Sequence, residues 1–569
     1  MALIKRDSAT TIAQVIARNT GYSNLEELEG KVSYWIDKLE EAADRIKLAI
    51  RNKELITIVG DYDADGVTST AILYMVLLFL GANVRYRIPH RLSEGYGINM
   101  NIIDEIDSGL IITVDNGIVA FDPIKAAKDK GIDVIITDHH LPAESGEFPE
   151  ADIIIDPHIP GTADFEDYCG AGIAYKLAKL LTDDKKLLAK LSCFAAIGTV
   201  ADVMPLVEEN RQIVKEGIKN MTTYGTRTTG LYSILHTADL EANMTATDIA
   251  FKIGPMINAC GRLFDDGADI AVKAITYDGK YDENIGIQIN EYNETRKKKV
   301  KAGVEAAYNN IAMNCLHGDV PLVIYEPSIE EGIVGIIAGR LTEDKQVPTF
   351  VFTDSHEPGI YKGSGRSAGG VHLKNLLDAC SDTLYKYGGH AEAAGVSVKA
   401  DKFEEMIEAF QEKCPELIGS TDSDDTYYDL EIKANEIEDT LKELKKYEPF
   451  GEGNPRPVFL IKGFQLSPRY SSTYKTLGEN QEHLRLFGVG CSAIAFGQVD
   501  RYHELSDPSK LDLIATISEN FYMGRGETQL EVVYMDEAKA SFTKSLLAMK
   551  LEEMAKDRYW KEQDCYGWY

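Results

Sequence analysis

The sequence contains neither a long hydrophobic run nor a paired-cysteine motif. Its longest apolar stretch, Ala71–Leu80, is too short to cross a bilayer, which takes about 20 residues in a helix. The opening MALIKRDSATTIAQ has no apolar signal core. The eight cysteines are scattered, and no two form a C-x-x-C pair, which argues against a disulfide framework and against a zinc site. We therefore expect a cytoplasmic protein with no membrane partner.

Basic residues are few compared with acidic ones. Lysine and arginine number 60 against 91 aspartates and glutamates, so the net charge is −31. Taken alone, this charge argues against a nucleic-acid binder, because phosphates need basic partners. Such a function requires that the basic residues gather in a groove, while the acidic ones lie elsewhere or bind metal.

Alternation of strands and helices dominates the first half of the chain. Short β-rich runs at 55–60, 84–88, 110–114, 134–137 and 153–155 are separated by helix-like stretches, for example 67–80 and 123–130. This alternation predicts an α/β fold with a mostly parallel, doubly wound sheet. In such sheets, ligands bind at the carboxyl ends of the strands.

The length of 569 residues predicts several domains. Residues 29–51 carry apolar groups at helical spacing, and residues 285–316 form a second helical pattern that holds the basic run 296–301. A polar stretch near 419–425 is typical of a linker, and short β-like runs with Gly and Pro turns beyond it favour a small β-barrel. We expect these parts: a helical segment at 1–50, a catalytic α/β domain at 51–284, a connector helix at 285–318, a second α/β domain at 319–418, a β-barrel at 425–540 and a charged helical tail at 541–569.

Acidic residues follow three of the predicted strands. The first strand ends in G-D-Y-D-A-D-G, the second in V-D-N-G and the third in T-D-H-H, and a later G-T-V-A-D-V-M-P adds one more carboxylate. These segments contribute Asp61, Asp63 and Asp65, then Asp115, then Asp138, His139 and His140, and finally Asp202. In a parallel sheet, the strand ends converge, and several carboxylates at one edge repel unless cations neutralise them. Two divalent ions about 3.5–4 Å apart would do so and would activate a water for attack on phosphate. Carboxylates suit Mg²⁺ and Mn²⁺, and an imidazole ligand favours Mn²⁺.

Each of these motifs also has a plainer interpretation. A single Asp at a strand end usually caps the following helix, and a His–His pair in a loop is often a surface feature. The ordered set D-x-D, D and D-H-H is not explained by caps, so we favour the metal site.

The same motifs occur in a known family. G-D-Y-D-A-D-G-V-T-S-T, V-D-N-G-I and T-D-H-H resemble the first three motifs of the DHH phosphoesterases, and C-G-A-G-I-A-Y-K-L and G-T-V-A-D-V-M-P-L are similar to segments of their bacterial RecJ family. G-G-H-A-E-A-A-G at 388–395 resembles the glycine-rich signature of the DHH-associated (DHHA1) domain. P-F-G-E-G-N-P-R-P-V-F at 449–459 and H-L-R-L-F at 483–487 resemble parts of the RecJ OB fold. The resemblance covers residues 50–540.

The resemblance implies a two-metal site with Mn²⁺ preferred and Mg²⁺ accepted. The implied ligands are Asp63, Asp65, Asp115, His139 and Asp202. Asp61, Asp138 and His140 would lie beside them as catalytic residues, with Asp138 orienting a ligand imidazole and protonated His140 stabilising charge on the phosphoryl oxygens. Two positions depart from the family. Val59 stands where many members have a histidine, and we expect Asp61 to supply that ligand. Glu330 stands where a histidine is frequent, which puts a substrate contact in doubt.

The resemblance also implies how substrate is held. The implied substrate-binding residues are Arg91, Arg262, Arg366, Ser367, Gly389 and His390. Among them, Arg262, Arg366 and Ser367 are expected to form a 5′-phosphate pocket. A single arginine is more often a solvated surface charge, and the run 296–301 is either a solvated helix face or a wall of the substrate channel.

These expectations imply an exonuclease that hydrolyses single-stranded DNA 5′→3′ to mononucleotides in DNA repair, recombination or replication. It would be a monomer, with a single-strand-binding protein and a helicase as family-typical partners. One alternative is a phosphodiesterase for short RNA or cyclic dinucleotides, against which the OB-like region argues. Another is an inactive nucleic-acid-binding scaffold, which should have lost metal ligands. A small pyrophosphatase is disfavoured by the length of the chain.

Overall fold

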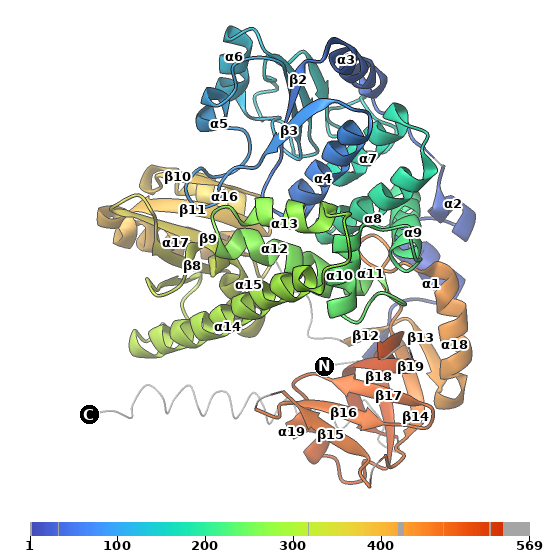
Figure 1. The fold of residues 1–569 in the computed structure, drawn as a ribbon. Helices are drawn as coiled ribbons and strands as arrows, with labels where there is room; N and C mark the ends of the chain where they lie inside the picture. Colours follow the sequence, from blue (N-terminus) through green and yellow to red (C-terminus); the bar gives the residue numbers. More distant parts are fainter. Residues whose placement is uncertain are drawn as a thin grey trace.

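In a computed structural model of the chain, the described residues are 3–31, 33–316, 318–418, 426–469, 471–478, 480–522 and 525–538. Figure 1 shows an α/β unit at the top, a second α/β unit at the left and a β-rich unit at the bottom, with the long helix α14 (Glu283–Met313) crossing the middle. The predicted linker at 419–425 and the predicted charged tail at 541–569 lie outside the described residues. Over the described residues, no helix is long and apolar enough to cross a membrane.

The first unit is built on a parallel five-stranded sheet, as the sequence predicts. The strand order is β3-β2-β4-β5-β6, and every neighbouring pair is parallel. The central strands are mostly apolar and almost entirely buried, as is usual when helices cover both faces. The strands are β2 (Leu55–Val59), β3 (Asn83–Arg87), β4 (Leu110–Val114), β5 (Asp133–Thr137) and β6 (Ile153–Ile155).

Helices cover the two faces of this sheet with separate cores. On one face, Ile102 of α5 and Ile124 of α6 pack against Ile111 and Ile136 of the sheet. On the other face, α3, α4 and α7 bury their apolar sides together with a further layer of helices. The helices are α3 (Leu39–Asn52), α4 (Ala64–Phe79), α5 (Met100–Asp104), α6 (Phe121–Asp129), α7 (Gly170–Leu181), α8 (Lys185–Ala201), α9 (Glu208–Met221), α10 (Thr229–Thr237), α11 (Ala246–Asp248), α12 (Gly254–Leu263) and α13 (Gly267–Thr276).

The N-terminal segment departs from the predicted helix over 29–51. The helix α2 (Leu25–Glu29) stops at Gly30, where φ is +64°, and α3 begins only at Leu39. Between them, the backbone N–H of Tyr34 donates to Glu209 at 2.9 Å, so tertiary contacts override the apolar periodicity. The segment before α1 (Ile12–Thr20) is not helical either, because β1 (Leu3–Lys5) pairs in parallel with β12 (Thr426–Tyr428).

The second α/β unit follows α14, which matches the predicted connector. Its sheet has the order β10-β11-β9-β8-β7, with only β7 and β8 parallel. The helix α15 packs on this sheet and on α14. Its elements are β7 (Leu322–Tyr325), α15 (Val334–Lys345), β8 (Thr349–Asp354), β9 (Ile360–Arg366), α16 (Leu373–Ala379), β10 (Lys386–Gly389), β11 (Ala393–Lys399) and α17 (Phe403–Leu417).

The C-terminal unit is the predicted small β structure. Seven strands run in the order β13-β14-β18-β19-β17-β16-β15. A bridge between Leu466, just after β14, and Gly488, just after β16, draws distant parts of the sheet together. Its elements are β13 (Leu430–Lys433), α18 (Ile437–Leu444), β14 (Phe459–Gln465), β15 (Tyr474–Leu477), β16 (His483–Phe487), β17 (Cys491–Ala495), α19 (Val499–His503), β18 (Lys510–Tyr522) and β19 (Arg525–Glu537).

Candidate metal centre and phosphate pocket

The acidic strand ends do converge. Asp61 and Asp63 lie in the turn from β2 to α4, Asp115 follows β4, and His139 follows β5. Ligand atoms lie within 4.8 Å of one another in three groups: Asp61, Asp63 and Asp115; Asp65, His139 and Asp202; Asp115, His139 and His140. The two groups that include Asp115 share its carboxylate, so Asp115 is central to the cluster.

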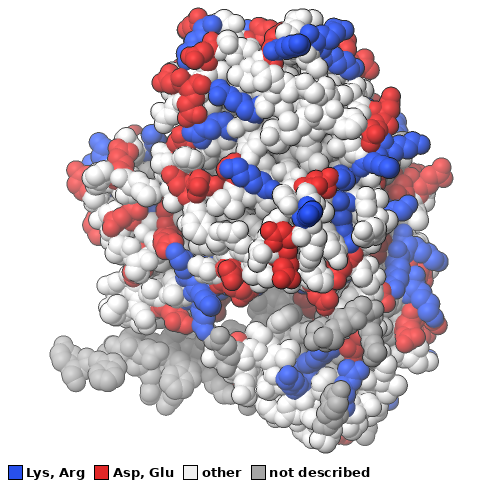
Figure 2. Space-filling model, viewed as in Figure 1, with Lys and Arg blue, Asp and Glu red and all other residues white. Residues whose placement is uncertain are grey.

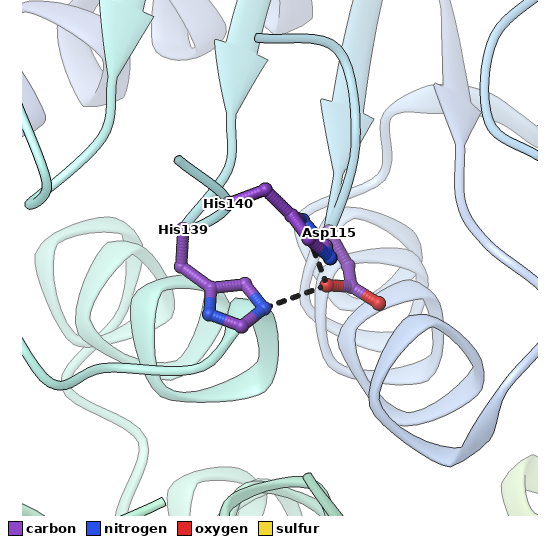
Figure 3. A group of neighbouring side chains, drawn as sticks. All are labelled: Asp115, His139 and His140. Carbon is purple, nitrogen blue, oxygen red and sulfur yellow. Dashed lines mark hydrogen bonds and ion pairs between the residues drawn. The ribbon is translucent and has the colours of Figure 1, made fainter. Parts of the chain in front are cut away.

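Figure 3 shows both imidazoles directed at the carboxylate of Asp115. The Nε2 of His139 lies 3.1 Å from Asp115 Oδ1, and the Nδ1 of His140 lies 4.0 Å from the same oxygen. His139 Nε2 also lies 3.5 Å from a carboxylate oxygen of Asp202 and 3.8 Å from one of Asp65. One nitrogen therefore faces three carboxylates.

The start of α7 fixes Asp65. The backbone N–H groups of Gly170 and Ala171 donate to its two carboxylate oxygens at 2.6 and 3.0 Å. A Cβ at Gly170 would lie 2.7 Å from Asp115, and one at Gly198 would lie 2.4 Å from an oxygen of Asp65. Glycine at these two positions allows the helices to approach the carboxylates this closely.

The carboxylate of Asp138 contacts the imidazole of His140 and not that of His139. Its Oδ1 lies 2.7 Å from His140 Nδ1 and accepts from the backbone N–H of His139, while Oδ2 accepts from Ile118 N–H. Asp138 thus orients the imidazole of His140, whereas the Nε2 of His139 faces the other carboxylates. His140 also lies beside the hydroxyl of Tyr96, at 3.1 Å, and that hydroxyl donates to the backbone carbonyl of Asp115 at 2.9 Å.

Burial and mutual repulsion shift the pKa values of this cluster. Burial, and then the charge of Asp63, raise the pKa of Asp65 to about 6; burial, and then Asp65, raise that of Asp202 to about 8. Burial and the neighbouring carboxylates also raise the pKa of Asp115 well above its usual range. Burial and the neighbouring carboxylates therefore both oppose the ionised forms of these aspartates, and a bound cation would favour them.

The two histidines differ in charge. Burial lowers the pKa of His139 to about 3, so its imidazole is neutral and keeps a lone pair for a cation. Burial opposes the charged form of His140, but the hydrogen bond to Asp138 and the negative charges of Asp138, Asp202 and Asp63 together outweigh burial and raise the pKa of His140 to about 9. Five carboxylates and a neutral imidazole form a donor set that suits divalent Mn²⁺ or Mg²⁺.

Arginines lie beside this cluster without carboxylate partners. The guanidinium of Arg91 stacks over the ring of Tyr62 at 4.5 Å. Arg262 donates to the carbonyl of Gly332 at 3.2 Å, and burial, followed by the charge of Arg91, lowers its pKa to about 9. Over the described stretches of chain, neither arginine nor Arg366 forms an ion pair. Such unpaired, partly buried guanidinium groups are suited to bind phosphate.

Two serines near Arg366 make different contacts. Arg366, at the end of β9, donates to Ser364 Oγ at 2.8 Å, and both side chains face Gly335 of α15. The hydroxyl of Ser367 instead donates to the carbonyl of Val371. Ser364 was missed, although period-2 alternation along a strand places it on the same side as Arg366.

The remaining expected residues lie in the second unit. Gly389 ends β10 with a φ of +143°, and a Cβ there would lie 2.4 Å from the carbonyl of Ala393. His390 has an exposed side chain, and its backbone N–H donates to that same carbonyl at 2.9 Å. Glu330, where a substrate contact was in doubt, forms an ion pair with Lys299 of α14.

Asp156 was also missed. It follows β6 directly and is buried, and its pKa is raised to about 8 by burial and then by Asp138. Like the other acidic residues, Asp156 directly follows a predicted strand, so the same criterion identifies it. Its segment, I-D-P-H, contains a single carboxylate, and the motif therefore drew no attention.

Family models match three segments of the chain. They are described as "DHH family, N-terminal domain" at residues 55–199, "DHHA1 domain" at 318–416 and "RecJ OB domain" at 428–534. Among curated relatives, the single-stranded-DNA-specific exonuclease RecJ of Haemophilus influenzae is 30% identical over 532 residues, which cover 88% of this chain and 90% of that protein. The chain belongs to the RecJ family of DHH phosphoesterases. The expected order of a DHH domain, a DHHA1 domain and an OB domain is thereby confirmed.

Another RecJ relative and two solved structures support the same assignment. RecJ of Bacillus subtilis is 33% identical over 512 residues. The aligned region covers 87% of this chain but only 63% of that relative, so this chain spans less than two thirds of its length. RecJ of Thermus thermophilus has been solved with Mn²⁺ and with Mg²⁺. The Mn²⁺ structure matches 93% of this chain and 76% of that one, with a TM-score of 0.75 and 27% identity. The expected use of these two ions agrees with the donor set found here.

Proposed function

We propose that this protein is a metal-dependent exonuclease that hydrolyses single-stranded DNA from the 5′ end and releases mononucleotides. The observation that carries the proposal is the complete cluster of Asp63, Asp65, Asp115, His139 and Asp202 beside unpaired arginines, in a chain of the RecJ family. An inactive scaffold needs no such cluster, because uncompensated buried carboxylates oppose folding.

In this proposal, Asp63, Asp65, Asp115, His139 and Asp202 hold two divalent ions, with Asp61 beside them. When bound, such ions neutralise the scissile phosphate and lower the pKa of the attacking water. The five ligand residues fix the place of cleavage.

His140 and Asp138 act on the phosphate from one side. Because His140 is protonated up to a pH of about 9, it can donate to a phosphoryl oxygen and stabilise the negative charge that develops there. Asp138 keeps the imidazole oriented and charged through the 2.7 Å contact with its Nδ1.

The 5′ end is recognised by Arg366, Ser364 and Arg262. A terminal phosphate in this pocket places the first phosphodiester at the metal centre, which limits cleavage to the end of the strand. Arg91, stacked on Tyr62, would hold the phosphate of the first nucleotide step. Gly389 and His390 would line the pocket from the second unit.

The net charge of −31 is compatible with binding of a DNA strand at the pocket. Figure 2 shows lysine and arginine interspersed with aspartate and glutamate over the face in view. Specific attraction for the strand therefore arises from the unpaired arginines of the pocket, since paired surface charges largely cancel.

A monomeric state, a cytoplasmic location and interactions with a single-strand-binding protein and a helicase are further parts of this proposal. They rest on the resemblance to the RecJ family. The alternative of short RNA or cyclic dinucleotides as substrates is less well supported, because the OB domain provides a surface for a longer strand.

The test uses the full chain with Mn²⁺ and a 5′-phosphorylated, 3′-labelled single-stranded DNA, beside the matching duplex and a single-stranded RNA. Stepwise shortening of the single-stranded DNA alone is expected. The matched variant Asp115→Asn should lower the rate on the order of a thousandfold or more. Failure to shorten the DNA would refute the proposal, and cleavage of the RNA alone would assign the protein to oligoribonucleotide hydrolysis.

A further inference from the structure

The segment between β3 and α5 carries two side chains to the metal centre. Arg91 stacks over the ring of Tyr62 at 4.5 Å, and the hydroxyl of Tyr96 donates to the backbone carbonyl of Asp115 at 2.9 Å. The segment spans residues 88–99 and contains neither helix nor strand. The positions of Arg91 and Tyr96 therefore depend on the contacts that this segment makes with its surroundings.

The carboxylate of Asp265 binds this segment next to Arg91. Its Oδ1 accepts from the backbone N–H groups of Leu92 and Ser93 at 2.9 and 3.2 Å, and its Oδ2 accepts from the hydroxyl of Ser93 at 2.6 Å. The Nδ1 of His90 lies 3.8 Å from the same Oδ2. Hydrogen bonds to an ionised carboxylate are stronger than those between neutral groups, so Asp265 holds the turn beside Arg91 firmly.

Within the segment, Glu94 makes the turn compact. Its carboxylate accepts from the backbone N–H of His90 at 2.7 Å and from the guanidinium of Arg87 at 2.6 Å. The backbone N–H of Glu94 donates to the carbonyl of His90 at 2.8 Å. The turn is therefore a single unit, which Arg87 attaches to β3 and Asp265 attaches to the helices beside the sheet.

Asp265 follows the helix α12 by two residues, and α12 also contacts the acidic turn after β2. The backbone N–H of Ala64, in that turn, donates to Asn258 Oδ1 at 2.8 Å. A Cβ at Gly261 would lie 2.8 Å from the backbone carbonyl of Tyr62. The helix thus touches the metal-binding turn at two points and leads directly to the residue that binds the Arg91 segment.

Arg91 is consequently fixed relative to the metal centre from two sides. Its guanidinium lies on the ring of Tyr62, which belongs to the acidic turn itself. Its backbone is fixed through the neighbouring Leu92, whose N–H is bound by Asp265. Arg262, in the proposed 5′-phosphate pocket, stands three residues before Asp265, so one short stretch of chain supports both arginines.

We propose that Asp265 is a positioning residue that fixes Arg91 at the phosphate of the first nucleotide step. This inference rests on the exonuclease function proposed above and deepens it, because Asp265 acts on the strand only through the segment of Arg91. Without the carboxylate, two N–H groups of the turn lose this acceptor, and Arg91 keeps its stacking on Tyr62. The strand should then bind more weakly, whereas Arg366 and Ser364 should still distinguish a 5′-phosphate from a 5′-hydroxyl.

Hydrogen–deuterium exchange of the full chain without DNA tests the contact itself. Mass spectrometry follows the peptide that covers residues 88–97. In Asp265→Ala, the amides of Leu92 and Ser93 should exchange at least about tenfold faster than in the wild type. Asp265→Asn should restore most of the protection, because its side-chain oxygen can still accept from these amides.

Asp266→Ala is the matched control for the exchange experiment. Asp266 is the next residue, and its side chain caps no helix and forms no ion pair within the part of the chain that the structure describes. Exchange in residues 88–97 should stay at the rate of the wild type in this variant. Unchanged exchange in Asp265→Ala would overturn the proposal.

A double-mutant cycle tests whether Asp265 acts through Arg91. The full chain is titrated in EDTA against a 5′-phosphorylated, 3′-labelled single-stranded DNA, and Kd is read from fluorescence anisotropy. Arg91→Ala should weaken binding about tenfold and Asp265→Ala about fivefold. The double variant should bind within about twofold of Arg91→Ala, because both substitutions remove the same contact. In Asp265→Ala, the ratio of the Kd values for 5′-hydroxyl and 5′-phosphate strands should stay near that of the wild type.

Two results of the binding series would overturn the role of Asp265. Losses that add in the double variant would show that Asp265 does not act through Arg91. A loss of the preference for a 5′-phosphate in Asp265→Ala would show that it acts through Arg262 instead. If the wild type failed to digest single-stranded DNA with Mn²⁺, the exonuclease function would be refuted, while the exchange experiment would still decide whether Asp265 fixes the segment of Arg91.

Discussion

Arg211 of α9 donates a hydrogen bond of 2.6 Å to the backbone carbonyl of Glu448, which lies 237 residues later in the chain. The same guanidinium donates to the carbonyls of Tyr447 and Pro449 and to Glu29 at 3.1 Å, and its side chain is fully buried. One side chain thus joins the N-terminal segment, the DHH domain and the segment that leads into the OB domain.

Replacing Arg211 by Met should destabilise this junction. Among the described residues, the substitution leaves the buried carbonyl of Glu448 without a donor, while the carbonyls of Tyr447 and Pro449 keep Asn454 Nδ2 and Glu29 keeps Lys215. Because one carbonyl is left unsatisfied and several charge-assisted hydrogen bonds are lost, we expect a loss of about 2–3 kcal/mol in the free energy of unfolding. Urea denaturation measures it. Lys215→Met is the matched control, because Lys215 binds the same carboxylate from a side chain that is 46% exposed and should matter by less than about 1 kcal/mol. Equal losses in both variants would contradict the role given to Arg211.

The stability of the metal-free protein should fall as the pH rises from about 4 to about 8. Burial and neighbouring carboxylates raise the pKa of Asp65 to about 6 and that of Asp202 to about 8, whereas an unfolded aspartate titrates near 3.8. Across this window, the folded state binds more protons than the unfolded state, so stability decreases with increasing pH.

Thermal unfolding in EDTA across this pH range tests the prediction. Asp202→Asn should flatten the dependence, because it removes one of the titrating groups. Added Mn²⁺ should reverse the trend, since a bound cation favours the ionised carboxylates. If the stability of the wild-type protein rose with pH in EDTA, the pKa values of Asp65 and Asp202 would not be raised in the folded state.

Removal of the hydroxyl of Tyr96 should slow catalysis without weakening binding. This hydroxyl donates to the carbonyl of Asp115 and lies 3.1 Å from His140, so it positions both residues at the metal centre. We expect Tyr96→Phe to lower kcat about tenfold with KM changed little, because the ring that lines the site is kept. Tyr62→Phe is the control, since the Tyr62 hydroxyl makes no hydrogen bond with the described residues. A change confined to KM would instead assign Tyr96 to substrate binding.

The sequence predicted the metal centre better than its surroundings, for a physical reason. A parallel sheet brings its strand ends together whatever the loops do, so the strand order alone predicts that Asp63, Asp115 and His139 lie at one edge of the sheet. Their assignment as metal ligands came from the resemblance to the family. The helix over 29–51 could not, because Gly30 and the contact of Tyr34 with Glu209 override a local pattern. The partners of the arginines depend on packing between the two α/β units, which local sequence does not encode.

Ser364 and Ser367 test whether the sequence resemblance or the packing in the structure identifies the serine that binds the 5′-phosphate. Sequence resemblance indicated Ser367, but its hydroxyl is bound to the carbonyl of Val371, whereas that of Ser364 lies 2.8 Å from Arg366. We expect Ser364→Ala to lower kcat/KM about tenfold on a 5′-phosphorylated strand and hardly at all on a 5′-hydroxyl strand, because only the phosphate uses the pocket. Ser367→Ala should instead lower thermal stability and leave the ratio of the two kcat/KM values near that of the wild type. If Ser367→Ala alone abolished the preference for a 5′-phosphate, the loop after β9 would have to rearrange when the strand binds, and the pocket would be built as the resemblance implied.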